Sequence, residues 1–177
     1  MPYAADSPLP PPRDAEGPYR ICCVCLGNIC RSPMAEVVLR DQLATAGLDD
    51  QVVVDSAGTG GWHVGDRMYP PARAQLRRRG YDGEAHRARQ IDGSWLGELD
   101  LILAMDADNL RDLRALDPGG DQHHRIRLFG EVGGLDGADV PDPYYGNDAD
   151  FAHVLAMLES GMATVVDQLR AAYFADR

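Results

Sequence analysis

The stretch RICCVC (residues 20–25) is followed directly by LGNICRSP (residues 26–33). The first part is short and apolar and ends at a Gly-Asn turn, which is typical of a buried parallel β-strand. Ser32 is expected to cap the following helix, with Pro33 at its first position and Gly47 at its end. This stretch therefore predicts a strand, a short loop and a helix in immediate succession.

The same alternation continues along the chain. In the last segment, apolar residues recur at spacings of three and four from Phe151 to Tyr173, which indicates one long helix with an apolar face. Repeated strand–helix units predict an α/β fold, with a four-stranded parallel sheet flanked by helices on both faces. The other predicted strands cover residues 51–55, 99–105 and 125–129, and the other predicted helices cover residues 71–79 and 107–116.

The composition predicts one compact domain. The chain has 177 residues, of which 45% are hydrophobic. Residues 1–18 hold six of the twelve prolines, so we expect a flexible extension there and a single domain over residues 19–177. No run approaches the roughly 18 apolar residues of a membrane span, and the N-terminus lacks the pattern of a secretory signal. The net charge of −11 argues against nucleic acid and membrane surfaces as partners.

The basic residues and the cysteines exclude several kinds of functional site. All 17 basic residues are arginine, which excludes a Walker-type nucleotide site and a Schiff-base enzyme. Four cysteines, Cys22, Cys23, Cys25 and Cys30, lie within nine residues and so cannot join distant segments by disulfides. No second Cys or His pair follows at metal-ligand spacing, so no metal is expected. A reducing, cytoplasmic setting with at least one working thiol fits best.

The loop after the first strand carries the strongest chemical signal. Five residues separate Cys25 from Arg31, and the loop leads directly into the start of a helix. Consecutive backbone N–H groups in such a loop can bind an anion, with the positive end of the helix dipole behind them. Arg31 adds two donors that match two phosphate oxygens. The same surroundings favour the thiolate of Cys25, which could then attack phosphorus, whereas Cys22 and Cys23 are interpreted as buried strand residues.

Two further motifs accompany this loop. Asp55-Ser56-Ala57-Gly58-Thr59 follows the second predicted strand, and Pro141-Asp142-Pro143-Tyr144-Tyr145 precedes the last helix. In this order, the three motifs resemble those of the low-molecular-weight protein tyrosine phosphatases, and the resemblance spans about Tyr19 to Phe174. It implies a flavodoxin-like fold and a phosphatase that needs no cofactor.

The resemblance also implies roles for individual residues. Cys25 would be the nucleophile that forms a phosphocysteine, and Arg31 would bind the phosphoryl group together with the amides of Leu26, Gly27, Asn28, Ile29 and Cys30. Asp142 would protonate the leaving oxygen and then deprotonate water. Cys30 would form a reversible disulfide with Cys25 that protects it from over-oxidation. Residues implied to hold the loop and orient the thiolate are Asn28, Ser32, Ser56 and His86.

Some side chains also have a simpler interpretation. Trp62, Tyr144 and Tyr145 could form the walls of a slot for an aromatic ring, although Trp62 could equally be a packing residue. From the residues alone, Asp142 could be a turn-forming residue before proline, and His86 an exposed loop residue. Asp106 is interpreted as a helix cap, and Arg77-Arg78-Arg79 as a solvated helix end. The remaining histidines, including His63, are expected to be surface or cap residues.

Three alternatives stay beside the tyrosine phosphatase. Arsenate reductases use the same loop but pass oxidation to later cysteines, and this chain has none after Cys30. Protein-arginine phosphatases are similar too, but the resemblance suggests a small polar residue where this chain has Ile29. A non-catalytic phosphopeptide-binding module would have no need of Asp142. We therefore expect phosphotyrosine-containing proteins as substrates, phosphate as product or inhibitor, and a monomer or weak dimer.

Overall fold

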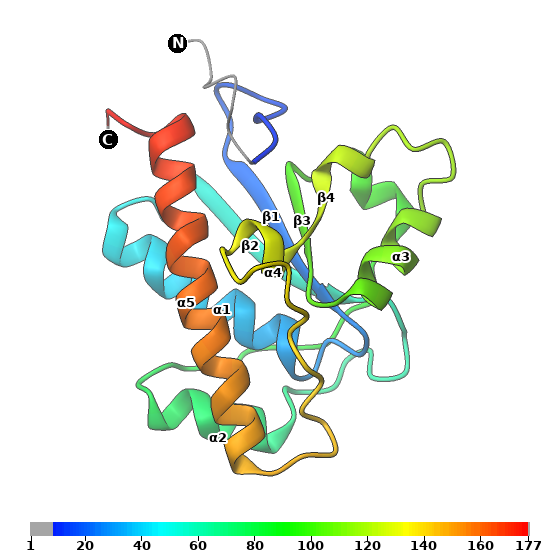
Figure 1. Cartoon of the computed structure of the whole chain (residues 1–177), viewed down its shortest axis with the longest axis vertical. Coiled ribbons are helices and arrows are strands. Elements are labelled where there is room, and N and C mark those ends of the chain that lie inside the picture. Colours follow the sequence, from blue (N-terminus) through cyan, green and yellow to red (C-terminus); the bar gives the residue numbers. More distant parts are fainter. Residues whose placement is uncertain (1–8, 177) are drawn as a thin grey trace.

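The computed structural model describes residues 9–176. Within them, one parallel sheet has the strand order β2-β1-β3-β4 (Figure 1). The strands are β1 (Tyr19–Cys25), β2 (Val52–Gly58), β3 (Leu101–Ala104) and β4 (Ile126–Leu128). The α-helices are α1 (Arg31–Ala46), α2 (Pro70–Arg78), α3 (Ala107–Ala115), α4 (Phe129–Val132) and α5 (Asp148–Tyr173), and short 3-10 helices are η1 (Gly93–Gly97) and η2 (His123–Arg125).

Helices cover both faces of this sheet, as predicted. Side chains alternate along β1, so that Ile21 and Cys23 pack into one apolar cluster and Cys22 and Val24 into another. The first cluster lies under α1 and α5, and the second includes Leu113 of α3. Figure 1 shows α1 and α5 on one side of the sheet and α3 on the other. The predicted four-stranded α/β architecture is therefore confirmed, including the burial of Cys22 and Cys23.

The start of α1 differs from the prediction. The helix begins at Arg31, and the residue before it, Cys30, makes no side-chain capping hydrogen bond. Ser32 therefore lies inside the first turn of the helix, where its side chain can form hydrogen bonds with the preceding loop. The predicted end is confirmed, because Gly47 adopts a left-handed conformation with φ of 72° after the last turn.

Helix α5 packs together with α1 on one face of the sheet. Asn147 accepts a hydrogen bond from the N–H of Asp150, whose side chain accepts from the N–H of Asn147, and this capping box begins the helix. Gly161 is required within the helix because a Cβ there would lie 2.3 Å from the ring of Phe129 on α4. By length and composition alone α5 could cross a membrane, but core helices of globular domains meet the same criterion, and its apolar face is buried against α1.

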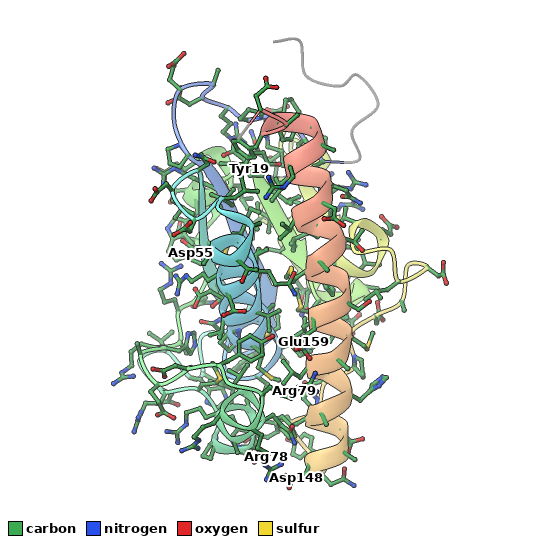
Figure 2. The ribbon with its side chains drawn as sticks, turned by 90° about the vertical axis from the view of Figure 1, so that its left-hand side faces the viewer. Tyr19, Asp55, Arg78, Arg79, Asp148 and Glu159 are labelled. Carbon is green, nitrogen blue, oxygen red and sulfur yellow. The ribbon has the colours of Figure 1, made fainter. Side chains whose placement is uncertain are left out.

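Ion pairs tie α2 to α5. Arg78 Nη2 lies 3.4 Å from Asp148 Oδ2, and Arg79 Nη2 lies 2.7 Å from Glu159 Oε1. Figure 2 shows Arg78 and Asp148 near the N-terminal end of α5, with Arg79 and Glu159 further along it. The predicted solvated helix end is thus exposed, but two of its three arginines also pair with α5.

Residues 9–18 lie against the domain, in contrast to the expected flexible extension. Leu9 is only 2% exposed, and its carbonyl oxygen accepts a hydrogen bond from the Tyr173 hydroxyl at 2.7 Å. The Tyr19 hydroxyl donates to Pro10 O at 2.8 Å, and the rings of Tyr19 and Tyr173 stack at 5.6 Å. Residues 1–8 of the expected extension lie outside the described residues.

Arg13 completes the attachment of this N-terminal segment. Its Nε donates to Leu99 O at 2.8 Å and its Nη2 to Leu96 O at 3.0 Å, while its N–H donates to the Asp100 carboxylate at 2.6 Å. A proline-rich sequence suggests flexibility, but it also leaves carbonyl oxygens free to accept hydrogen bonds from a folded surface. Here the hydroxyl groups of Tyr173 and Tyr19 donate those hydrogen bonds, at the end of the sheet opposite the carboxyl ends of the strands.

Candidate active site

A cleft of about 220 Å³ opens at the carboxyl end of the sheet, where parallel folds of this kind form their sites. Cys25 is the last residue of β1, and residues 26–30 form the loop that leads into α1. Cys25, Arg31 and Asp142 all line the cleft, although 117 positions separate the first from the last. The structure therefore brings the three expected catalytic residues into one cavity.

Asn28 gives the loop its shape. Its φ of 57° is left-handed, which is uncommon for a residue other than glycine. Its Nδ2 donates to Ser32 Oγ at 2.8 Å and to Ser56 Oγ at 3.0 Å, and its carbonyl oxygen accepts from His86 Nε2 at 2.7 Å. The four residues expected to hold the loop thus form one connected and largely buried hydrogen-bond network.

The second motif also contacts this loop. A Cβ on Gly58 would lie 2.6 Å from Leu26 O, so only glycine permits this approach of the two chains. Thr59 and Gly60 then donate their N–H groups to Cys25 O at 2.9 Å and Leu26 O at 2.8 Å. The end of β2 therefore fixes the carbonyl groups of Cys25 and Leu26 through backbone hydrogen bonds.

Ser32 links this network to the nucleophile. Its Oγ lies 3.0 Å from Cys25 Sγ and accepts a hydrogen bond from Asn28. The Ser32 hydroxyl, which also lies 3.3 Å from Ala57 O, has one proton and can donate it to the sulfur to stabilise a thiolate. The side chain predicted as a helix cap is thus directed at Cys25 instead.

Arg31 is the main buried charge of the site, with a side chain only 3% exposed. Its Nη1 donates to Asp106 Oδ2 at 2.5 Å and to Val140 O at 3.1 Å. Burial opposes the charge, but the pKa of Arg31 is nevertheless raised by Cys25 and by the carboxylates of Asp106 and Asp142. Its Nε is buried and finds no acceptor within the described part of the chain, so this donor remains for a ligand oxygen.

Asp106 is the residue whose role the sequence understates. Its Oδ1 accepts the N–H of Asn109 at 2.7 Å, which confirms the predicted cap of α3. Its Oδ2 makes the ion pair with Arg31. The available signal was its position directly after a buried strand, because the carboxyl ends of parallel strands meet at one edge.

Asp142 faces Arg31 from the loop before α5. Its Oδ2 lies 3.6 Å from Arg31 Nη2, and its Oδ1 accepts the N–H of Tyr144 at 3.2 Å. The side chain is 46% exposed, so water reaches it. It can therefore exchange a proton with solvent while remaining next to the buried cation.

Aromatic side chains form the rim. Tyr144 and Tyr145 meet edge to face at 4.8 Å, and Trp62 lines the same cleft. Trp62 is 73% exposed and Tyr145 is 96% exposed, which leaves both available to a ligand. The ring of Trp62 also covers Gly60, where a Cβ would lie 1.8 Å from it, and its role as a wall of a slot for an aromatic ring stays a prediction.

His63 also lines this cleft. It was expected to be a surface or cap residue, but its ring lies over Gly27 of the loop, where a Cβ would be 3.1 Å from His63 Cδ2. Its Nδ1 lies 3.2 Å from Asp66 Oδ2, which fixes the ring orientation. Sequence reasoning missed it because a single histidine in a loop has no characteristic spacing.

The other three cysteines are buried thiols with raised pKa values. Burial and the neighbouring Cys25 raise the pKa of Cys30, and burial also raises the pKa values of Cys22 and Cys23. All four cysteines are free, so the pairing of Cys25 with Cys30 stays a prediction. Among residues 9–176, no three His, Cys, Asp or Glu side chains are grouped as a metal site would require.

A family comparison decides what this site belongs to. Residues 20–173 match the family model described as low molecular weight phosphotyrosine protein phosphatase. The chain belongs to this family. A relative named low molecular weight protein-tyrosine-phosphatase, from Streptomyces coelicolor, is 47% identical over 156 residues, which cover 86% of this chain and 94% of the relative.

Solved structures of the phosphatase family agree with this fold. The protein tyrosine phosphatase from Entamoeba histolytica superimposes with a TM-score of 0.82 at 32% identity, covering 86% of this chain and 97% of that one. The YwlE arginine phosphatase, in a form with a phosphorylated active-site serine, gives a TM-score of 0.77 at 26% identity over 85% of this chain and 95% of its own. The flavodoxin-like fold and the cysteine-dependent tyrosine phosphatase family are thus established for this chain.

Proposed function

We propose that this phosphatase hydrolyses phosphotyrosine in proteins with Cys25 as nucleophile, Arg31 as phosphate ligand and Asp142 as proton donor. The observation that carries the proposal is the cleft itself: Cys25 lines it together with residues of the following loop, and Arg31 Nη2 and Asp142 Oδ2 lie 3.6 Å apart in the same cleft. A phosphoryl group has the charge to bind such a cation-lined loop.

The first chemical step transfers the phosphoryl group to the enzyme. The Cys25 thiolate forms a bond to phosphorus while the bond between phosphorus and the tyrosyl oxygen breaks. Asp142, in its protonated form, gives its proton to that oxygen, so the leaving group departs as neutral tyrosine. The loop N–H groups and Arg31 hold the phosphoryl oxygens as their charge redistributes.

The second step restores the enzyme. Asp142, now a carboxylate, takes a proton from water as the water oxygen attacks phosphorus, and the bond between sulfur and phosphorus breaks. The leaving electron pair returns Cys25 to its thiolate, which Ser32 stabilises through its hydroxyl. Inorganic phosphate departs, and it competes with substrate because it fits the same loop. No step calls for a metal or a cofactor.

The aromatic rim favours an aryl substrate over phosphoarginine. Trp62 and Tyr145 offer exposed ring faces above the loop, where the ring of a phosphotyrosine would stack. Ile29, which also lines the cleft, offers no polar group to a guanidinium. Similarity to an arginine phosphatase nevertheless makes phosphoarginine the second substrate to test.

A parallel assay tests the proposal. Matched peptides that carry phosphotyrosine, phosphoserine or phosphoarginine are compared by phosphate release, with and without EDTA. We expect turnover of the phosphotyrosine peptide at least a hundredfold above the others and no effect of EDTA. Preference for phosphoarginine would instead assign the second function, and absence of all turnover with intact phosphate binding would indicate a binding module.

The cellular location and the oligomeric state of the phosphatase are also part of the proposal. Four free thiols in one chain favour the reducing cytoplasm, and we propose a monomer or weak dimer there. Light scattering over a concentration series tests the oligomeric state. A dimer that persists at nanomolar concentration would contradict it.

A further inference from the structure

Tyr69 connects the phosphate-binding loop to the loop that carries the proton donor. Its backbone N–H donates to Ile29 O at 2.9 Å. Its ring stacks on Tyr144, with centroids 4.9 Å apart and planes inclined by 29°. Tyr69 does not itself line the cleft, so it contacts both loops from behind the site.

The backbone of Tyr69 is firmly held. Pro70 and Pro71 follow it at the start of α2, and a residue before proline is restricted to an extended conformation. Met68, which precedes it, is fully buried. On its other side the Tyr69 ring lies 6.0 Å from the ring of Phe151 on α5. The ring is therefore positioned by the protein core before it meets Tyr144.

The proton-donor loop contacts the rest of the domain on both sides of Asp142. On the N-terminal side, Val140 donates its N–H to Met105 O at 2.8 Å and accepts from Arg31 at 3.1 Å. On the C-terminal side, Tyr144 donates its N–H to Asp142 Oδ1 and rests its ring on Tyr69. The orientation of the Asp142 carboxylate thus depends on where Tyr144 lies.

We propose that Tyr69 is a positioning residue for the general acid. Through Tyr144 it holds the carboxyl group of Asp142 at a set distance from the loop that binds the phosphoryl group, because the same residue is hydrogen-bonded to that loop at Ile29. This role rests on the proposed function. Loss of the ring would leave Cys25, Arg31 and the loop N–H groups in place but would allow the carboxyl group to move away from the leaving oxygen.

The test compares Tyr69→Leu and Tyr69→Phe with the unaltered protein on two substrates. Phenyl phosphate has a strongly basic leaving group that requires a proton, whereas the p-nitrophenolate of p-nitrophenyl phosphate leaves with little help. The value of kcat/KM reports the steps through departure of this group. We expect Tyr69→Leu to lower kcat/KM roughly tenfold for phenyl phosphate and less than twofold for p-nitrophenyl phosphate, a size that one ring–ring contact can supply.

Four controls separate positioning from general damage. Tyr69→Phe keeps the ring and should restore both rates, and the inhibition constant for phosphate should stay within twofold in each variant. Tyr81→Leu removes a partly buried tyrosine at the other end of α2, which bonds to Glu159 on α5, and should affect both substrates equally. In a chain that already carries Asp142→Ala, Tyr69→Leu should cause no further selective loss.

The outcomes distinguish this inference from the proposed function. An equal loss on both substrates, or the same selective loss in the Asp142→Ala background, would overturn the role of Tyr69 and leave the phosphatase assignment untouched. Absence of aryl phosphate hydrolysis by the unaltered protein would instead refute the proposed function itself.

Discussion

Arg31 Nη1 lies 2.5 Å from Asp106 Oδ2, and the guanidinium is almost fully buried. The two residues are 75 positions apart: Arg31 begins α1 after the loop that follows β1, and Asp106 lies two residues beyond the end of β3. A carboxylate that also caps α3 therefore sets the plane of the cation that is to bind phosphate. Bidentate binding by arginine depends on that plane as well as on charge.

Replacing Asp106 should weaken both binding and catalysis. Asp106→Asn keeps the size of the side chain but leaves Arg31 with a weaker partner, so we expect kcat/KM to fall roughly tenfold and the inhibition constant for phosphate to rise by a similar factor. Asp139→Asn is the matched control, because Asp139 accepts the N–H of Ala107 at the same helix start without contacting Arg31. Similar losses in both variants would assign the effect to α3 instead.

Removing the nucleophile should separate binding from turnover. Cys25→Ser should abolish hydrolysis of p-nitrophenyl phosphate, since the serine hydroxyl is not ionised at neutral pH, whereas calorimetry should still detect phosphate binding through the loop and Arg31. Cys22→Ser, a change on the same strand but outside the cleft, serves as control. Substantial residual turnover by Cys25→Ser would contradict the assigned nucleophile.

Loss of the proton donor should lower activity most for the substrate whose leaving group needs a proton. Asp142→Ala is expected to lower kcat/KM for phenyl phosphate about a hundredfold and for p-nitrophenyl phosphate by much less, because only the first leaving group needs the proton. Asp150→Ala alters a carboxylate of the nearby helix cap and provides the comparison. If both substrates lose the same factor, Asp142 acts in some other way.

Thiol reactivity should single out one cysteine. The raised pKa values of Cys22, Cys23 and Cys30 keep these groups protonated at pH 7.5, and a protonated thiol is a poor nucleophile. Brief treatment with iodoacetate should therefore add one carboxymethyl group, located on Cys25 by mass spectrometry of peptides, and phosphate should slow the reaction. Modification of Cys30 at an equal rate would contradict this reasoning.

The N-terminal segment should contribute to stability and leave activity unchanged. Arg13→Ala removes side-chain hydrogen bonds to Leu99 O, Leu96 O and Gln122 Oε1, so we expect a loss of about 1 kcal/mol in the free energy of unfolding by urea. Glu16→Ala, in the same segment and exposed, should change it by less than about 0.5 kcal/mol. An unchanged unfolding midpoint for Arg13→Ala would show that the segment does not stabilise the domain.

Local patterns were sufficient for most of the fold. The apolar run at residues 20–25, the Gly-Asn turn and the spacing from Phe151 to Tyr173 each reflect burial of one strand or one helix face, and burial leaves a periodic trace in the sequence. Element ends were less predictable: β2 continues to Gly58 because Cys25 and Gly58 pair across the sheet, a contact between distant segments.

The loop from Cys25 to Arg31 could be recognised from the sequence because its residues are consecutive, and its geometry follows from a strand that leads directly into a helix. The partners of that loop come from elsewhere in the chain. Asp106 and Tyr69 reach it only because the sheet brings the ends of β1 and β3 together and α2 packs beside α5. Contacts of this kind have no period and no fixed spacing, so tertiary structure alone decided them. The reactive loop could thus be predicted from consecutive residues, whereas its position in the site depends on packing between distant segments.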